Sequence, residues 1–175
     1  MEEILRDRNR QLEKTELIGL CRKDMGLLSS YYQKEITAMH IAVRTSLPDN
    51  PLFIDGNAEQ LGKTIMSLLN NGMYAIAKKY GKKAYPAEIG LALESKDGQA
   101  VIRLYDNGVG IEQSILDKIF DPFFTTKTTG EAAGIGLYLS KEIILNHHGQ
   151  IAVRSEKDEL TEFTITLPLW EEKSV

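Results

Sequence analysis

The feature that most limits what this chain can fold into is a helical pattern over residues 57–79. Apolar residues recur there at steps of three and four, which is typical of a helix that buries one face. They are Leu61, Ile65, Leu68, Leu69, Met73 and Ile76. Because a one-sided apolar helix needs another element to cover that face, the rest of the chain must supply one.

Two hairpins supply the covering sheet. Residues 89–104 contain two runs in which apolar residues alternate with others, separated by a Lys-Asp-Gly turn at residues 96–98. Residues 151–167 contain a second such pair around a polar turn at residues 155–160. Strict alternation predicts strands with one buried face, and the short turns predict antiparallel pairs.

Helices are expected before and between the hairpins. Helix formers dominate residues 1–37, of which the first dozen are mostly charged, and further helices are predicted at residues 113–120 and 136–147. Short strands are expected at residues 40–43 and 52–54. The sequence therefore predicts an α/β fold, a two-layer sandwich in which a mixed, mostly antiparallel sheet carries helices on one face.

Composition excludes several classes of function. The 175 residues carry 21 Lys and Arg against 25 Asp and Glu, a net charge of -4 that argues against a general nucleic-acid binder. No apolar run approaches the roughly 20 residues of a membrane span, and the charged first ten residues are unlike a signal peptide. A cytoplasmic segment outside the membrane is expected. Cys21 is the single cysteine, so no internal disulfide is expected.

The most informative polar segment is DNGVGI, from Asp106 to Ile111, directly after a predicted strand. An ionised Asp106 only accepts hydrogen bonds, so it can accept the exocyclic N–H of an adenine. Gly108 and Gly110 let the backbone approach a ligand closely. The alternative is a type I′ turn, which Asn-Gly often makes, and on this segment alone the turn is the simpler interpretation.

Asn71 and the segment GIGL suggest where phosphates would bind. The amide oxygen of Asn71, on the predicted helix, is a suitable ligand for Mg²⁺, although most helical asparagines are solvated surface residues. Gly134, Gly136 and Leu137 stand at a predicted helix start, where free N–H groups can bind an anion. The alternative is that the glycines merely permit a tight loop into the helix.

Two further segments are ambiguous by themselves. KKYGKK, at residues 78–83, is interpreted as a solvated helix end favoured by the helix dipole, and the alternative is a lysine that reaches a phosphate. FDPFFTTK, at residues 120–127, gathers three aromatic residues and Lys127 in a stretch without periodicity. Its aromatic residues would be unexceptional as core residues.

Taken in order, the Asn71 helix, DNGVGI, FDPFFTTK and GIGLYLSKEII resemble the ATP-binding domain of sensor histidine kinases, from about residue 40 to Leu169. The resemblance implies the Bergerat fold, shared with gyrase-type ATPases. It also implies three parts: a helical segment over residues 1–36 that could be the stump of a dimerisation helix, an ATP-binding catalytic domain over residues 37–170, and a tail over residues 171–175.

The resemblance assigns roles to individual residues. It implies that Asn71 is the Mg²⁺ ligand, that Asp106 accepts from the adenine amino group, that Gly108 and Gly110 border the base, and that Thr161 completes the adenine site.

The remaining assignments concern the phosphates and a lid. By the same resemblance, Gly134, Gly136 and Leu137 would lie along the phosphates, and residues 112–133 would form a lid that contains Phe123, Phe124 and Lys127.

The sequence departs from the family's pattern at three places. Ala132 and Ala133 stand where the family commonly has Gly and Thr, and Leu160 stands where it usually has Gly. Ser67, four residues before Asn71, stands where hydrolytic relatives carry a glutamate base and many kinases a second asparagine. Without a carboxylate to activate water, only slow ATP hydrolysis is expected.

No histidine of the chain has the context of a phosphoacceptor. His40 is in a strand-like segment, and His147 and His148 stand at a predicted helix end before Gly149. The predicted function is therefore that of a catalytic domain that donates the γ-phosphoryl of ATP to a histidine on a separate dimerisation domain. The alternatives are an anti-sigma-factor-type serine kinase and a degenerate nucleotide-binding module.

The predicted ligands and partners follow from that function. ATP or ADP, Mg²⁺, a histidine-bearing dimerisation domain and a response regulator are expected, and nucleic acid is not. The full-length protein is expected to be a homodimer, and the sequence leaves open whether it is anchored in a membrane.

Overall fold

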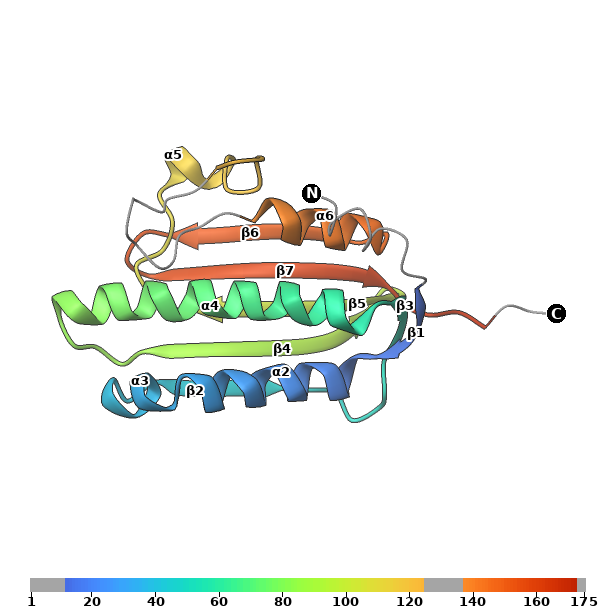
Figure 1. Cartoon of the computed structure of the whole chain (residues 1–175), viewed down its shortest axis with the longest axis horizontal. Helices are drawn as coiled ribbons and strands as arrows, with labels where there is room; N and C mark the ends of the chain where they lie inside the picture. Colours follow the sequence, from blue (N-terminus) through green and yellow to red (C-terminus); the bar gives the residue numbers. More distant parts are fainter. Residues whose placement is uncertain (1–11, 125–136, 173–175) are drawn as a thin grey trace.

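The computed structural model describes residues 12–124 and 137–172 and arranges them in two layers (Figure 1). Within these residues, one layer is a five-stranded sheet in the order β2-β4-β5-β7-β6. In that order its strands are Ala42–Ser46, Glu88–Lys96, Gln99–Asp106, Leu160–Pro168 and Gln150–Glu156. β2 is parallel to β4, and the other neighbouring pairs are antiparallel. The predicted mixed, mostly antiparallel sheet is confirmed.

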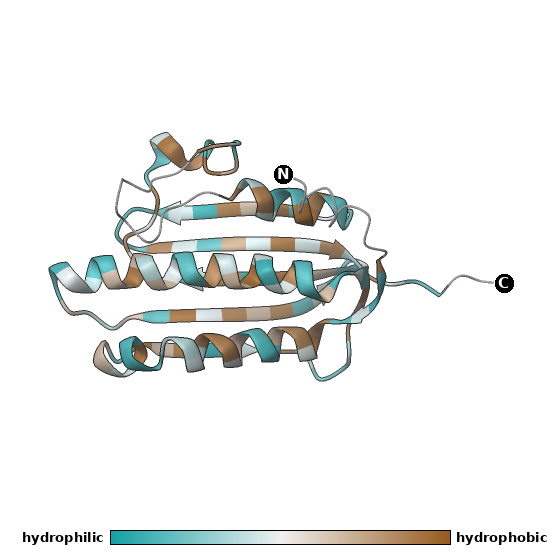
Figure 2. Cartoon of the chain, in the orientation of Figure 1, coloured by the Kyte–Doolittle hydropathy of each residue, from teal (hydrophilic) through white to brown (hydrophobic). Residues whose placement is uncertain are grey.

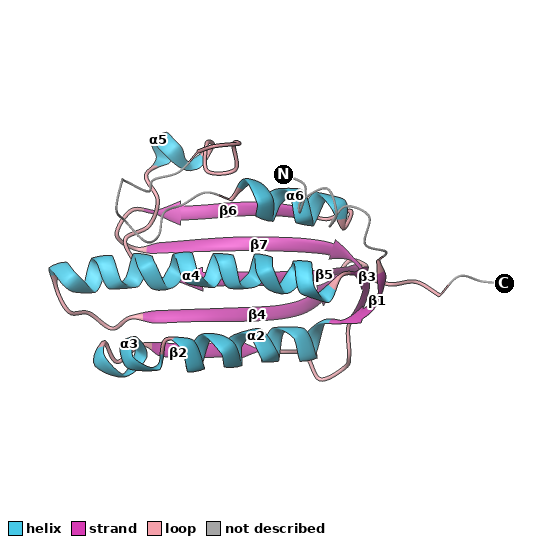
Figure 3. Cartoon of the chain, in the orientation of Figure 1, coloured by secondary structure: helices cyan, strands magenta, loops and turns pink. Residues whose placement is uncertain are grey.

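Helices α2 (Leu17–Tyr31), α4 (Ala58–Lys82) and α6 (Tyr138–Asn146) cover one face of the sheet (Figure 3). α4 lies between the other two and packs against β4 and β5. The short helix α3 (Gln33–Ala38) follows α2 in the chain. The short helix α5 (Gln113–Leu116) packs beside β6. The predicted two-layer sandwich is therefore confirmed. In the described part of the chain, no helix is long and apolar enough to cross a membrane.

Helix α4 forms because its sequence caps it and gives it one apolar face. The Asn57 side chain accepts a hydrogen bond from the N–H of Gln60 at 3.0 Å, which satisfies a free donor of the first turn. Lys79 and Lys82 stand in the last turn, where positive charge offsets the helix dipole. All six apolar residues that predicted the helix are buried.

The core lies between the two layers. Buried and less buried residues alternate along β7, and Figure 2 shows the matching alternation of hydropathy along the strands. The side chains of Ile89, Leu91, Ile102 and Ile165 are each about 1% exposed. This rigid sheet holds the end of β5 and the β6–β7 turn in fixed positions, and both contribute to the cavity described below.

The first part of the chain differs from the predicted continuous helix. Residues Glu13–Glu16 form strand β1, which pairs antiparallel with β3 (Phe53–Gly56), and α2 begins only at Leu17. The Thr15 hydroxyl donates to the carbonyl of Gly56 at 3.1 Å, so pairing with a distant strand overrides local helix propensity. The charged first eleven residues lie outside the described part.

Helix α2 packs into the same core as α4. Leu17, Cys21, Met25 and Leu28 are each at most 4% exposed. The predicted domain boundary after residue 36 stays a prediction. Because α2 lies before that boundary and packs into the core, substitutions in α2 can test it.

Other boundaries shift by a few residues. The strand expected at residues 40–43 begins at Ala42, because His40 stands in a turn with φ 51° after α3. The strand expected at residues 52–54 is β3. Helix α5 ends at Leu116 rather than at residue 120, and α6 is one to two residues shorter at its ends than predicted.

Candidate functional site

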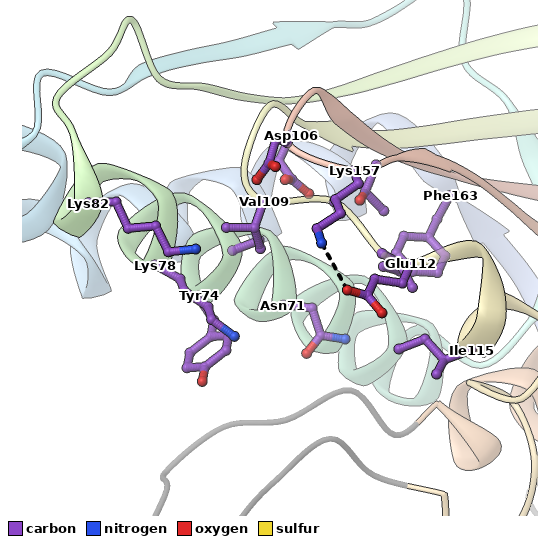
Figure 4. A pocket seen from close by; sticks show the side chains of 15 residues that line it. Asn71, Tyr74, Lys78, Lys82, Asp106, Val109, Glu112, Ile115, Lys157 and Phe163 are labelled. Carbon is purple, nitrogen blue, oxygen red and sulfur yellow. Dashed lines mark hydrogen bonds and ion pairs between the residues drawn. The ribbon is translucent and has the colours of Figure 1, made fainter.

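A cavity of about 310 Å³ opens between α4, the loop that follows β5 and the β6–β7 turn (Figure 4). We call residues 107–112 the glycine loop and residues 157–159 the β6–β7 turn. The residues that line the cavity are Asn71, Tyr74, Ala75, Lys78, Lys82, Asp106, Val109, Gly110, Ile111, Glu112, Ile115, Lys157, Asp158, Thr161 and Phe163. Sequence segments more than 80 residues apart thus meet at one site.

Asp106, the last residue of β5, is the buried acid of the cavity. It is 7% exposed, and its Oδ1 accepts the N–H of Gly108 at 2.9 Å. Burial raises the pKa of Asp106 to about 7, although the Gly108 N–H and the charge of Lys79 oppose the shift. A ligand N–H that donates to this carboxylate would favour its ionised form.

Thr161 lies directly opposite Asp106 in the pairing of β5 and β7. Its hydroxyl is 2.8 Å from that of Ser155, which in turn donates to the carbonyl of Leu160 and accepts the N–H of Ile111, both at 2.8 Å. This network fixes the C-terminal end of the glycine loop to the end of β6. Ser155 was not predicted as a site residue, and only its register opposite Thr161 could have indicated it.

Gly108 and Gly110 stand at positions where neighbouring backbone leaves no room for a side chain. A Cβ at Gly108 would lie 2.5 Å from the carbonyl carbon of Ala75 on α4. Gly110 has φ +71°, and a Cβ there would collide with the carbonyl oxygen of Glu156. Gly110 lines the cavity, whereas Gly108 packs against α4 beside it. The glycine loop is therefore held tightly between α4 and the β6–β7 turn.

Asn71 faces the same cavity from α4, as Figure 4 shows. Its Nδ2 is buried and has no hydrogen-bond partner. Neighbouring Asn70 is exposed and accepts a hydrogen bond from the Tyr32 hydroxyl at 2.8 Å. A single amide oxygen at a cavity wall suits Mg²⁺, which takes its other ligands from phosphates and water.

Lysines add positive charge around the cavity. Lys78 and Lys82 line it from successive turns of α4. Lys157 also lines it and pairs with Glu112 at 3.0 Å, the dashed contact of Figure 4. The lining also holds Asp106, Glu112 and Asp158, so acidic and basic residues are equal in number there, and Lys78 and Lys82 together make the α4 side positive.

Comparison with known proteins identifies the family. The sequence model of the histidine kinase-, DNA gyrase B- and HSP90-like ATPases matches residues 56–171, about two thirds of the chain. The chain belongs to this family. Every described residue of the cavity lies within the matched range of the ATPase domain.

Relatives of this ATPase domain include sensor kinases. Sporulation kinase D of Bacillus subtilis is 34% identical over 123 residues, which are 70% of this chain and 22% of that protein. The catalytic domain of histidine kinase ThkA has the same fold, with a TM-score of 0.72 and 22% identity over 91% of this chain and 96% of that one.

A further structure contains histidine kinase ThkA in complex with the response regulator protein TrrA. It matches with a TM-score of 0.68 and 20% identity over 95% of this chain and 45% of that one. The first curated relatives are much longer than this chain, which spans between 14% and 50% of their length.

Some residues assigned by resemblance are not part of the described cavity. Lys127, Gly134 and Gly136 lie outside the described residues, as does most of the second half of the expected lid. Leu137 is 1% exposed in the core, and its N–H donates to the carbonyl of Ile119 at 3.0 Å. Its role along the phosphates stays a prediction.

The phenylalanine-rich segment is connected to the cavity of this ATPase domain through one aromatic pair. Phe120 packs edge-on against Phe163, with ring centroids 6.4 Å apart, and Phe163 lines the cavity. Phe124 packs against the core, whereas Phe123 is fully exposed with φ 65°.

Proposed function

We propose that the chain is the catalytic part of a sensor histidine kinase, which holds Mg²⁺-ATP and donates its γ-phosphoryl to a histidine on a dimerisation domain. The observation that carries the proposal is that Asp106, Thr161 and Asn71 line one cavity of an ATPase domain. Membership of the family implies ATP binding, and the kinase relatives support the transfer to histidine.

Asp106 and Thr161 would hold the base. The buried carboxylate accepts the adenine amino N–H, and the Thr161 hydroxyl, opposite it in the sheet, completes the adenine site. Tyr74, Lys78 and Lys82 lie along the α4 side of the same cavity. The nucleotide would thus be oriented by an acceptor at its base end and by the lysines of the α4 side.

Asn71 would contribute one oxygen to Mg²⁺. Its position at the cavity wall fits that role. The described residues contain no group of three or more His, Cys, Asp or Glu side chains that could hold a metal, so the phosphates and water would supply the other ligands. Bound Mg²⁺ would neutralise charge on the phosphate oxygens during transfer.

The histidines of the chain support a donor role only. Buried His147 accepts the Asn57 N–H at Nε2 (3.0 Å), and its Nδ1 contacts the carbonyl of Ile143 at 2.7 Å; burial lowers its pKa. His40 and His148 are exposed at turns. None lines the cavity, whereas transfer needs an acceptor nitrogen about 3–3.5 Å from the phosphorus.

In the proposed transfer, an imidazole nitrogen of the partner domain forms the new N–P bond at the γ-phosphorus. The bond from that phosphorus to the bridging oxygen breaks, ADP leaves with the electron pair, and the imidazole proton is lost to solvent. This chain positions the nucleotide and supplies charge. A response regulator would then receive the phosphoryl group, in the cytoplasm and from a homodimeric full-length kinase.

The Mg²⁺ assignment is tested by titration calorimetry with ATP, with and without Mg²⁺. We expect Mg²⁺ to tighten ATP binding to the wild-type chain and to have less than half that effect, in free energy, on Asn71→Ala. Asn70→Ala removes the neighbouring exposed amide and should keep the full Mg²⁺ effect. An Asn71→Ala variant with an unchanged Mg²⁺ effect would remove Asn71 from the metal site.

A further inference from the structure

Lys79, in the last turn of α4, connects three walls of the cavity without lining it. Its Nζ donates to the carbonyl of Asn107 in the glycine loop at 3.2 Å and to the carbonyl of Asp158 in the β6–β7 turn at 2.6 Å. The ammonium group also lies 4.4 Å from the centre of the Tyr85 ring. One half-buried cation therefore joins α4, the glycine loop and the β6–β7 turn.

Apart from the exposed Lys157–Glu112 pair, the walls that Lys79 joins are attached through single backbone bonds. The N–H of Val109 donates to the carbonyl of Ala75 on α4 at 3.2 Å, and the N–H of Asp158 donates to the carbonyl of Val109 at 2.6 Å. Hydrogen bonds to a charged group are stronger than such neutral ones. The two Lys79 contacts are thus well suited to fix the separation between the loop and the turn.

Asn107 transmits this attachment toward the strand beneath. Its side chain accepts the N–H of Glu88 at 2.7 Å and donates to the carbonyl of Pro86 at 2.8 Å. Because Asp106 precedes Asn107 directly, anchoring the Asn107 carbonyl also limits the movement of the Asp106 backbone. The Lys79 contact therefore adds to the sheet pairing of β5 in fixing the backbone next to the buried acid.

The charge of Lys79 acts on Asp106 as well. Burial is the largest effect on the pKa of Asp106 and raises it, whereas the Gly108 N–H and the nearby ammonium lower it. Tyr85 also faces Asp106, and burial raises the pKa of its hydroxyl to about 12, so that it remains neutral. The other charged residues around the cavity are Lys78, Lys82, Glu112, Lys157 and Asp158.

We propose that Lys79 is a positioning residue for adenine-nucleotide binding: it holds the glycine loop and the β6–β7 turn against α4. It acts through these groups and does not touch the nucleotide, in contrast to Lys78 and Lys82, which line the cavity. The inference rests on the proposed nucleotide site, in which Asp106 accepts from the base.

The test compares Lys79→Met, Lys79→Gln and Lys79→Arg by ADP titration calorimetry from pH 6 to pH 9. Lys79→Met removes both contacts and the charge, and should weaken ADP binding roughly tenfold at pH 7, equivalent to about 1.4 kcal/mol. As the pH is lowered, ADP affinity should fall to half of its high-pH value at a higher pH in Lys79→Met and Lys79→Gln than in wild type, because the ammonium group that lowers the pKa of Asp106 is gone. Lys79→Arg keeps a charged donor and should recover most of the affinity and the wild-type pH profile.

Lys83→Met is the matched control, because it removes the same charge from the exposed C-cap of the same helix and should leave ADP binding within twofold of wild type. Lys79→Met with wild-type affinity and pH profile would overturn the inference. So would failure of both Lys79→Met and Lys79→Gln to fold, since Lys79 would then serve stability alone. A wild-type chain that does not bind ADP would instead contradict the proposed function.

Discussion

At the scale of single residues, the cavity combines a buried acid, a hydroxyl and an amide with side chains that hold its walls together. Asp106, Asn71 and Thr161 were predicted and line one cavity. Ser155 and Lys79 were not predicted as site residues, because their importance comes from neighbours 6 to 79 positions away. From sequence alone, a lysine at a helix end is interpreted as solvated, because the residues that the fold brings next to it are not known.

Asp106→Asn tests the buried acid. Asn keeps an oxygen for the Gly108 N–H but loses the charged acceptor, so ADP affinity should fall roughly tenfold, about 1.4 kcal/mol. Stability should change in the opposite direction. The folded-state pKa is about 7 against 3.8 for the unfolded group, so above pH 4 the unfolded chain ionises first and Asp106 increasingly destabilises the fold up to about pH 7.

The stability of Asp106→Asn should therefore match wild type near pH 4 and exceed it at pH 8, by roughly 1–3 kcal/mol. Urea unfolding at the two pH values measures this difference. A variant that is less stable than wild type at pH 8, or that binds ADP with unchanged affinity, would contradict the account of Asp106.

At the scale of elements, local patterns predicted the hairpins and α4 but missed β1. Alternation and three- to four-residue periodicity are properties of the segment itself, and the predicted strands and helices appear within a few residues of their expected bounds. Strand β1 depends instead on pairing with β3, about 40 residues later, which no local pattern records. The packing of α2 against α4 likewise joins segments that are distant in the sequence, so it could not be predicted from a local pattern.

Leu28→Ala tests whether α2 belongs to the folding unit of the ATPase domain. Leu28 is fully buried, and truncating it should lower the free energy of unfolding by about 2–5 kcal/mol in a single cooperative transition. Leu27→Ala is the matched control, because Leu27 is 48% exposed, and it should change stability by less than about 0.5 kcal/mol. Equal and small effects of both substitutions would make residues 1–36 a separate segment.

At the scale of the whole molecule, the proposed function is that of a phosphoryl donor whose acceptor histidine lies on another domain. One face of the sheet supports the helices, and the cavity opens where the end of β5, the β6–β7 turn and α4 meet. In the proposed function, Ser67 stands where the family resemblance places a hydrolytic base, so we expect bound ATP to be hydrolysed only slowly in the absence of an acceptor. The fold class was predictable because segment order restricts topology, whereas the partner domain is a proposal.

The most direct test of this account is a transfer experiment with radiolabelled ATP and Mg²⁺. The chain alone should bind ATP and acquire no label on histidine, and adding a separately made dimerisation domain of the same kinase should place an acid-labile label on that partner. An equivalent partner with its acceptor histidine changed to glutamine should stay unlabelled. Label on the chain by itself that is lost in His147→Gln or His40→Gln, or transfer only to a serine-bearing partner, would contradict the account.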